Sequence, residues 1–216
     1  LFENDSSWID VPNIDMSSGD KLTISIWVNP TDITSMKNLN IMRQELIDLD
    51  FLIAFQGFGK ILSFGLNSSG VYSELDIPII STNYTNDWHN IVAVYDGESR
   101  FVYNDGILIG SDLKTGNVSY TSDASFTIGA AFPGVGPGER FIGMIDDVKI
   151  YNRALDTSEV SSLYNENTCT NTVTVYDTVT TNVTVYDTVR THINSSFPNS
   201  GLVAHYPFNG NANDES

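Results

Sequence analysis

Two stretches of the chain carry the oxygen-bearing side chains that calcium prefers. Asp146 and Asp147 are adjacent, and the sequence NGNANDES at 209–216 supplies Asn209, Asn211 and Asp214. Calcium binds roughly six to eight oxygens at about 2.3–2.6 Å, from carboxylates, amides, backbone carbonyls and water. The alternative is structural, because Asn-Gly forms turns and Asp146 can accept hydrogen bonds from the backbone. The residues by themselves leave both interpretations open.

Four aromatic residues in or near predicted loops could bind the apolar face of a sugar: Trp8, Tyr72, Tyr84 and Phe132. Phe132 begins a loop rich in Pro and Gly. The competing interpretation is that each ring covers the core, and we favour it for each ring taken alone. Trp27 and Trp88 are assigned to the core, because they lie within or at the start of apolar strands.

The composition restricts the partners. Acidic residues outnumber basic ones 27 to 10, and the formal net charge is −17. Such a surface repels a phosphate backbone, so no nucleic acid partner is expected. Cys169 is the only cysteine, which excludes an intrachain disulfide and a zinc site built from several thiolates. No apolar run approaches the ~20 residues of a membrane span.

The secondary structure that would carry these residues is predicted to be an all-β sandwich. Across 1–167, short strand-like runs are separated by turns rich in Gly, Asn, Asp and Pro. The clearest runs are 22–28, 50–55, 61–66, 90–95, 100–103 and 141–151. The turn sequences Asp96-Gly97 and Asn104-Asp105-Gly106 predict hairpins. In the run 88–95 apolar residues occupy both sets of alternate positions. We therefore expect both faces of its sheet to be covered, one by the partner sheet and the other by long loops.

One helix is predicted to close this region. Asp156 can cap it, and Glu159 follows three residues later, as in a capping box. Three residues share the face that should dock on the sandwich: Val160, Leu163 and Tyr164.

The remainder of the chain divides into two segments. TNTVTVYDTV at 170–179 is followed by TTNVTVYDTV at 180–189, a repeat with few charges. We interpret 168–200 as an extended spacer, with a β-hairpin packed on a neighbour as the alternative. Residues 201–216 contain one predicted strand, 202–208, and an Asn-rich turn, which is too little for a domain.

Several stretches together resemble one family. LTISIWVNP (22–30), WHNIVAVYDGESRFVYNDGILIG (88–110) and FIGMIDDVKIYNRALDTSEVSSLY (141–164) are similar to successive motifs of the laminin G-like domains of bacterial secreted and surface proteins. GLVAHYPFNGNANDES (201–216) resembles the opening strand of the same family. The resemblance implies an all-β, two-sheet antiparallel jelly-roll sandwich of the concanavalin A-like kind, secreted or at the cell surface.

The order of these motifs implies a window cut from a tandem array. The domain at 1–167 would lack its first strand, 168–200 would be the spacer, and 201–216 would open a following repeat. A missing first strand leaves an unpaired sheet edge. A spacer of this length can span roughly 100 Å, so 202–208 can fold back. We hypothesise that it does so and completes the first sandwich.

The resemblance also implies a metal site. Members of the family often hold calcium between the first strand and the strand before the closing helix. Carried over to this chain, the expected ligands are Asp146 and Asp214, with Asn209 and Asn211 beside them, and the expected cofactor is Ca²⁺. The site then depends on the fold-back of 202–208.

Catalysis is not expected. Some relatives with this sandwich hydrolyse glucans and need two carboxylates across the scissile bond. The nearest pattern here is Glu45-Leu46-Ile47-Asp48-Leu49-Asp50, where Asp48 and Asp50 share a face and Glu45 has the other parity. We therefore expect a non-catalytic module that binds carbohydrate or a cell-surface ligand, beside neighbouring repeats. The alternatives are a structural spacer domain in a tandem array and an accessory domain of a polysaccharide-degrading enzyme.

Overall fold

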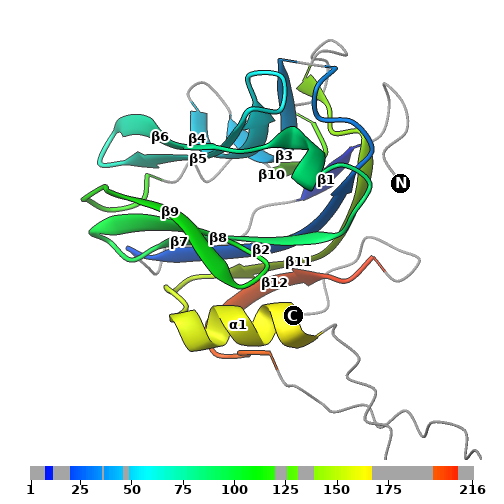
Figure 1. The fold of residues 1–216 in the computed structure, drawn as a ribbon. Coiled ribbons are helices and arrows are strands. Elements are labelled where there is room, and N and C mark those ends of the chain that lie inside the picture. The colour runs from blue at the N-terminus through cyan, green and yellow to red at the C-terminus, as the bar shows by residue number, and fades with distance from the viewer. Residues whose placement is uncertain are drawn as a thin grey trace, which may run out of the picture.

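The protein is an antiparallel β-sandwich of two layers. We describe a computed structural model in which residues 8–11, 20–35, 37–45, 49–119, 126–130, 139–166 and 197–208 are placed. The described strands form two six-stranded sheets that lie face to face, with one α-helix outside the second sheet (Figure 1). This confirms the predicted fold class.

The first sheet contains, in spatial order, β1 (Ile9–Val11), β10 (Phe126–Ile128), β3 (Asn38–Glu45), β4 (Leu49–Gln56), β5 (Ile61–Ser68) and β6 (Val71–Pro78). The second contains β12 (Leu202–Tyr206), β11 (Gly143–Tyr151), β2 (Leu22–Pro30), β7 (His89–Tyr95), β8 (Ser99–Asn104) and β9 (Ile107–Leu113). The helices are the 3-10 turn η1 (Ser81–Asn83) and α1 (Thr157–Glu166). None of the helices in these ranges is long and apolar enough to cross a membrane.

The core lies between the sheets and follows the two-residue period of a strand. Ile24, Ile26 and Val28 of β2 are fully buried against Phe64 and Leu66 of β5 and their neighbours. Because alternate side chains of a strand point to opposite faces, one half of each sequence run supplies this core. The other half faces outward and can form sites.

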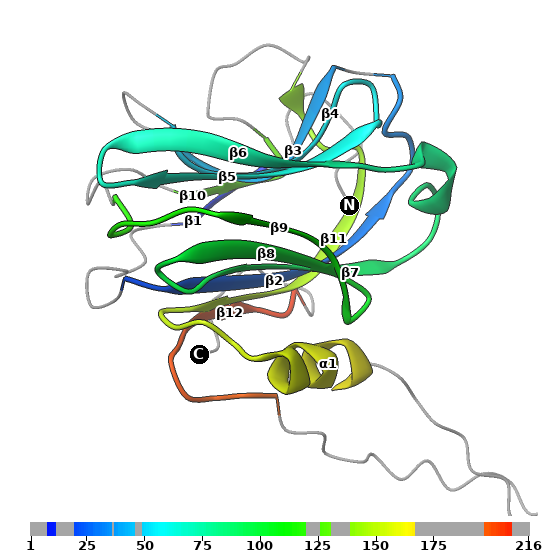
Figure 2. The ribbon, with the colours of Figure 1, turned by 60° about the vertical axis from the view of Figure 1, so that its left-hand side comes forward.

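The second sheet is covered on both faces, as predicted for the run 88–95. A second apolar cluster on its outer face includes Val92 and Val94 of β7, together with Val160 and Leu163 of α1. The outer cover therefore consists of α1 together with the loop residues 154–155 and the stretch 197–202, so a helix shares the role that was predicted for long loops (Figure 2).

Helix α1 begins as its sequence predicts. The Asp156 carboxylate accepts the backbone N–H of Ser158 at 2.8 Å and of Glu159 at 2.9 Å, and Glu159 accepts the backbone N–H of Asp156 at 3.0 Å. This is a complete capping box. Tyr164 stacks on the outward ring of Trp27, with the ring centroids 5.8 Å apart, so the helix is fixed over β2.

The predicted turn at Asn104-Asp105-Gly106 joins β8 to β9. Asp105 and Gly106 both have positive φ, 52° and 75°, as a tight two-residue hairpin requires. The Asp105 carboxylate accepts the backbone N–H of Asn90 and pairs with His89 Nδ1, both at 2.8 Å. The turn is thereby tied to the start of β7.

Strand β12 occupies one edge of the second sheet. It pairs with β11 so that Ala204 lies opposite Ile150 and Tyr206 opposite Val148. Ala204 and Tyr206 are both buried in the sandwich core. The predicted spacer repeats at 170–189, the turn at 209–216 and the first residues of the chain lie outside the described residues, and a tandem array stays a prediction.

Candidate functional site

A bulge in β11 turns two neighbouring carboxylates toward the same side. The register with β2 shifts between Asp146 and Lys149, and Asp147 has a φ of 48°. Ile145 and Val148 on either side both point into the core, so Asp146 and Asp147 both lie on the outer face. Asp is among the few residue types that tolerate this backbone region, and such strained positions cluster at functional sites.

Asp147 is held by two other elements. Its carboxylate pairs with His205 Nε2 of β12 at 2.8 Å and with the ammonium group of Lys149. Lys149 also pairs with Glu166, at the end of α1, at 3.1 Å. The Lys149 side chain is 1% exposed and its Nζ lies 4.6 Å from the ring centre of Phe197. One buried cation thus joins β11, α1 and the segment that carries β12.

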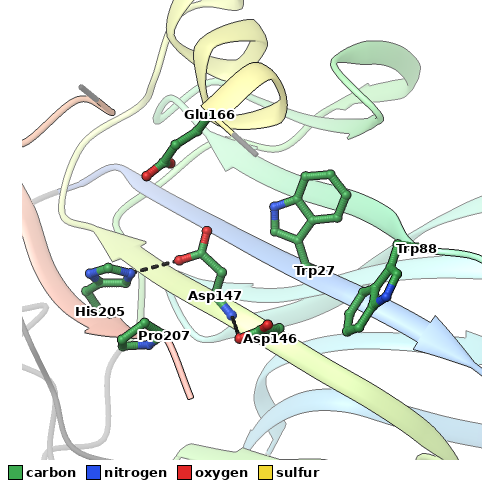
Figure 3. A pocket seen from close by; sticks show the side chains of 7 residues that line it. All are labelled: Trp27, Trp88, Asp146, Asp147, Glu166, His205 and Pro207. Carbon is green, nitrogen blue, oxygen red and sulfur yellow. Dashed lines mark hydrogen bonds and ion pairs between the residues drawn. The ribbon is translucent and has the colours of Figure 1, made fainter. Parts of the chain in front are cut away.

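A pocket of about 500 Å³ opens beside this network. Seven residues line it: Trp27, Trp88, Asp146, Asp147, Glu166, His205 and Pro207. Figure 3 shows the two indole rings on one side of the aspartates, His205 and Pro207 on the other, and Glu166 reaching in from α1. Trp88 is 37% exposed, so its ring is accessible. The pocket therefore combines an aromatic wall with a polar one.

The pocket carboxylates are partly removed from water. Burial raises the pKa of Asp146 and of Glu166 above the ordinary values, and Lys149 counteracts part of the effect at both. Asp146 Oδ1 accepts the backbone N–H of Asp147 at 2.8 Å, and Glu166 Oε2 faces Lys149. Within the described ranges the second oxygen of each has no hydrogen bond. These two oxygens can accept donors from a ligand.

The predicted calcium ligands are only partly within the described residues. Asp146 lies in the pocket, and Pro207, two residues before Asn209, lines it as well. Asn209, Asn211 and Asp214 lie outside the described residues. Among the placed residues, no group of three or more His, Cys, Asp or Glu side chains is arranged to hold a metal, and Asp147 is occupied by Lys149. Calcium binding therefore depends on 209–214 and stays a prediction.

If Asp146 and residues 209–214 form a calcium site, titration of calcium into chelator-treated protein should release heat and raise the melting temperature. Asp146→Asn should remove both effects, because it removes a charged ligand. Asp76→Asn, which makes the same charge change on β6, is the matched control. A melting temperature that calcium leaves unchanged would remove the metal from the site.

The aromatic rings predicted to bind sugar do not lie together on one surface where they are described. Trp8 precedes β1 at one edge of the first sheet, and the Arg140 guanidinium lies 5.1 Å from its ring centre. Tyr72 is inside β6 at the opposite edge, where its hydroxyl donates to Glu74 at 2.7 Å. Both rings lie outside the pocket, and their role in binding stays a prediction. Phe132 lies outside the described residues.

Two of the aromatic assignments need correction. Trp27 and Trp88, assigned to the core from the sequence, line the pocket. Tyr84 is 6% exposed and packs edge-on against Phe55, with centroids 5.5 Å apart, so its ring belongs to the core, which is the interpretation favoured for each of the four candidate rings. The alternation of residues along β2 could have shown that Trp27 faces outward. Trp27 shares its face with polar Ser25 and Asn29, whereas Ile26 and Val28 face inward.

In the run Glu45 to Asp50, which is the nearest sequence pattern to a catalytic carboxylate pair, the described residues have structural roles. Asp50 of β4 is 4% exposed and accepts a hydrogen bond from the Asn67 amide at 3.4 Å. Glu45 ends β3 and Leu49 begins β4, so the run joins two neighbouring strands. Asp48 lies outside the described residues.

Two antiparallel sheets in this strand order, with a pocket on one outer face, define a lectin-like jelly-roll domain. The chain belongs to the concanavalin A-like lectin/glucanases superfamily, whose laminin G family matches residues 3–161. A search of curated proteins gave no match.

Solved structures share the fold at low identity. A proposed carbohydrate-binding protein from Bacteroides ovatus is 17% identical with a TM-score of 0.63, over 98% of this chain and 52% of that one. The binding domain of Paraclostridial Mosquitocidal Protein 1 is 19% identical with a TM-score of 0.59, over 77% and 43%. Domain 4 of AbnA, an extracellular arabinanase from Geobacillus stearothermophilus, in complex with arabinotriose, is 24% identical with a TM-score of 0.54, over 73% and 72%. The chain thus spans about half or less of the first two proteins.

Proposed function

We propose that this chain is a non-catalytic carbohydrate-binding module and that the pocket between β2, β11, β12 and α1 is its binding site. The observation that carries the proposal is the pairing of an accessible indole ring, Trp88, with carboxylate oxygens across one cavity. The apolar face of a sugar stacks on an aromatic ring, while its hydroxyl groups donate to acceptors at the side.

The similar structures support this proposal by their ligands. One is a domain in complex with arabinotriose, one is the binding domain of a mosquitocidal protein, and one is from botulinum neurotoxin type C, whose cell entry depends on interaction with two ganglioside molecules. The lack of catalysis is supported by the site itself, since Asp147 is held by an ion pair with Lys149 and a hydrogen bond with His205 and is unsuited to act as a free acid or base.

The wider setting belongs to the same proposal. A module of this kind acts in a secreted or cell-surface protein, in adhesion or as an accessory domain of a polysaccharide-degrading enzyme, beside neighbouring repeats. Sequencing outward from both ends of the chain distinguishes these settings.

A glycan array, followed by calorimetry of the glycans that bind, tests the function. Trp88→Ala is expected to weaken binding about tenfold or more, because a central tryptophan supplies much of the energy of such a site. Phe58→Ala, which removes another exposed ring in the turn between β4 and β5, should leave binding unchanged. Equal losses in the two variants, or no glycan bound with calcium or without it, would contradict the proposal.

A further inference from the structure

The charges around the pocket discriminate between classes of sugar. Three of its seven lining residues are carboxylates, Asp146, Asp147 and Glu166, and the lining contains no lysine or arginine. A ligand that enters the pocket therefore meets acceptors and negative charge on its polar side.

The nearest cation cannot serve an anionic ligand. Lys149 is 1% exposed, lies beneath the carboxylates and makes ion pairs with both Asp147 and Glu166. The Phe197 ring closes another side of its ammonium group at 4.6 Å. The charge of Lys149 is thus neutralised by two carboxylates of the pocket wall, and its ammonium group is not itself part of the pocket lining.

His205 is engaged in the same way. Its Nε2 is 2.8 Å from Asp147 Oδ1, and the Phe197 ring packs against its imidazole, with centroids 5.3 Å apart. The imidazole therefore offers no free Nε2 donor to a carboxylate or sulfate group. The oxygens that remain available are those of Asp146 and Glu166, and both require a donor.

We infer that the pocket binds sugar units without negative charge, which donate hydroxyl, amide or ammonium hydrogens to Asp146 and Glu166, and that it rejects uronic, sialylated and sulfated sugars. The inference rests on the proposed function and names its ligand class. Like charges brought together in a partly buried site oppose binding strongly, whereas a hydroxyl or ammonium donor satisfies an acceptor that burial has deprived of water.

Matched glycans test this directly, with chelator present so that the carboxylates are free of metal. The probes are lactose with 3′-sialyllactose, galactotetraose with tetragalacturonate, and cellobiose with chitobiose. In each of the first two pairs we expect the neutral member to bind at least about tenfold more tightly. Chitobiose, which carries amines, should bind at least as tightly as cellobiose. Wild-type protein that binds the acidic member equally or more tightly overturns the inference and leaves the proposed function standing.

Variants locate the discrimination. Asp146→Asn and Glu166→Gln should each reduce the preference for the neutral member, because each removes a negative charge and keeps the shape. Asp76→Asn on β6 makes the same charge change away from the pocket and should preserve the preference. If both pocket variants discriminate like wild type, the inference is wrong. Binding that appears only when calcium is added assigns the carboxylates to a metal and also overturns it, and an array with no bound glycan removes the proposed function together with this inference.

Discussion

Replacing Lys149 with methionine is expected to lower the free energy of unfolding by about 3–5 kcal/mol at neutral pH, because it leaves two buried carboxylates without their cation. Asp147 and Glu166 have side chains that are 16% and 19% exposed. Chemical denaturation of wild type and variant measures the difference. The triple variant Lys149→Met, Asp147→Asn, Glu166→Gln, in which the charges are removed together, should recover most of the loss.

The loss should also depend on pH. Burial raises the pKa of Glu166, and Lys149 counteracts this effect. Without Lys149 the pKa of the folded state rises further above that of the unfolded state. Such a carboxyl costs stability in full above its folded pKa, and the cost declines as the pH falls from that value to the unfolded pKa, below which it is absent. The deficit of Lys149→Met should therefore shrink as the pH falls from neutrality toward the ordinary Glu pKa of about 4.3. A deficit that is constant over this range would show that lost packing, and not charge, causes it.

Replacing Arg100 with methionine is the second change with a large expected effect, again about 3–5 kcal/mol. Arg100 of β8 is 1% exposed and points between the sheets. Its guanidinium donates to Asp112 of β9 at 2.9 and 2.5 Å, and also crosses to the first sheet, where it donates to the backbone carbonyls of Phe64 at 3.1 Å and Ser73 at 2.6 Å. The substitution removes the donors of both carbonyls and the partner of Asp112.

Arg100→Lys is the matched control for this substitution. It keeps the charge and loses the planar fork that reaches two sheets at once, so its melting temperature should lie between those of wild type and the methionine variant. A methionine variant within about 1 kcal/mol of wild type would mean that apolar packing replaces the whole network.

Local patterns predicted the elements of this fold well. The capping box at Asp156 and Glu159 and the hairpin at Asp105-Gly106 depend on neighbours in sequence, and both are present as expected. The alternation of apolar residues likewise predicted the core of β2 and β5. These features are decided within a few residues, so one sequence suffices to predict them.

The site was predicted less completely, because contacts distant in sequence create it. Asp146 was identified by residue type. Asp147, which the bulge turns to the same face, is held there by Lys149 and by His205, 58 residues away. Trp88 precedes a strand that is buried on both faces, so its position alone could not show that its ring is accessible. The pocket forms where α1 covers β2 and β12 pairs with β11, and neither contact can be read from neighbouring residues in the sequence.

The position of β12 at the sheet edge means that ligand binding should change how much force is needed to detach this strand from β11. His205 and Pro207 belong to a segment that rejoins the sandwich far along the chain from the rest of the pocket wall. A ligand that contacts both the β12 segment and the rest of the pocket wall links them, because its binding free energy is lost when β12 separates from β11. A bound chain should therefore withstand a larger pulling force on its C-terminal end than a free one.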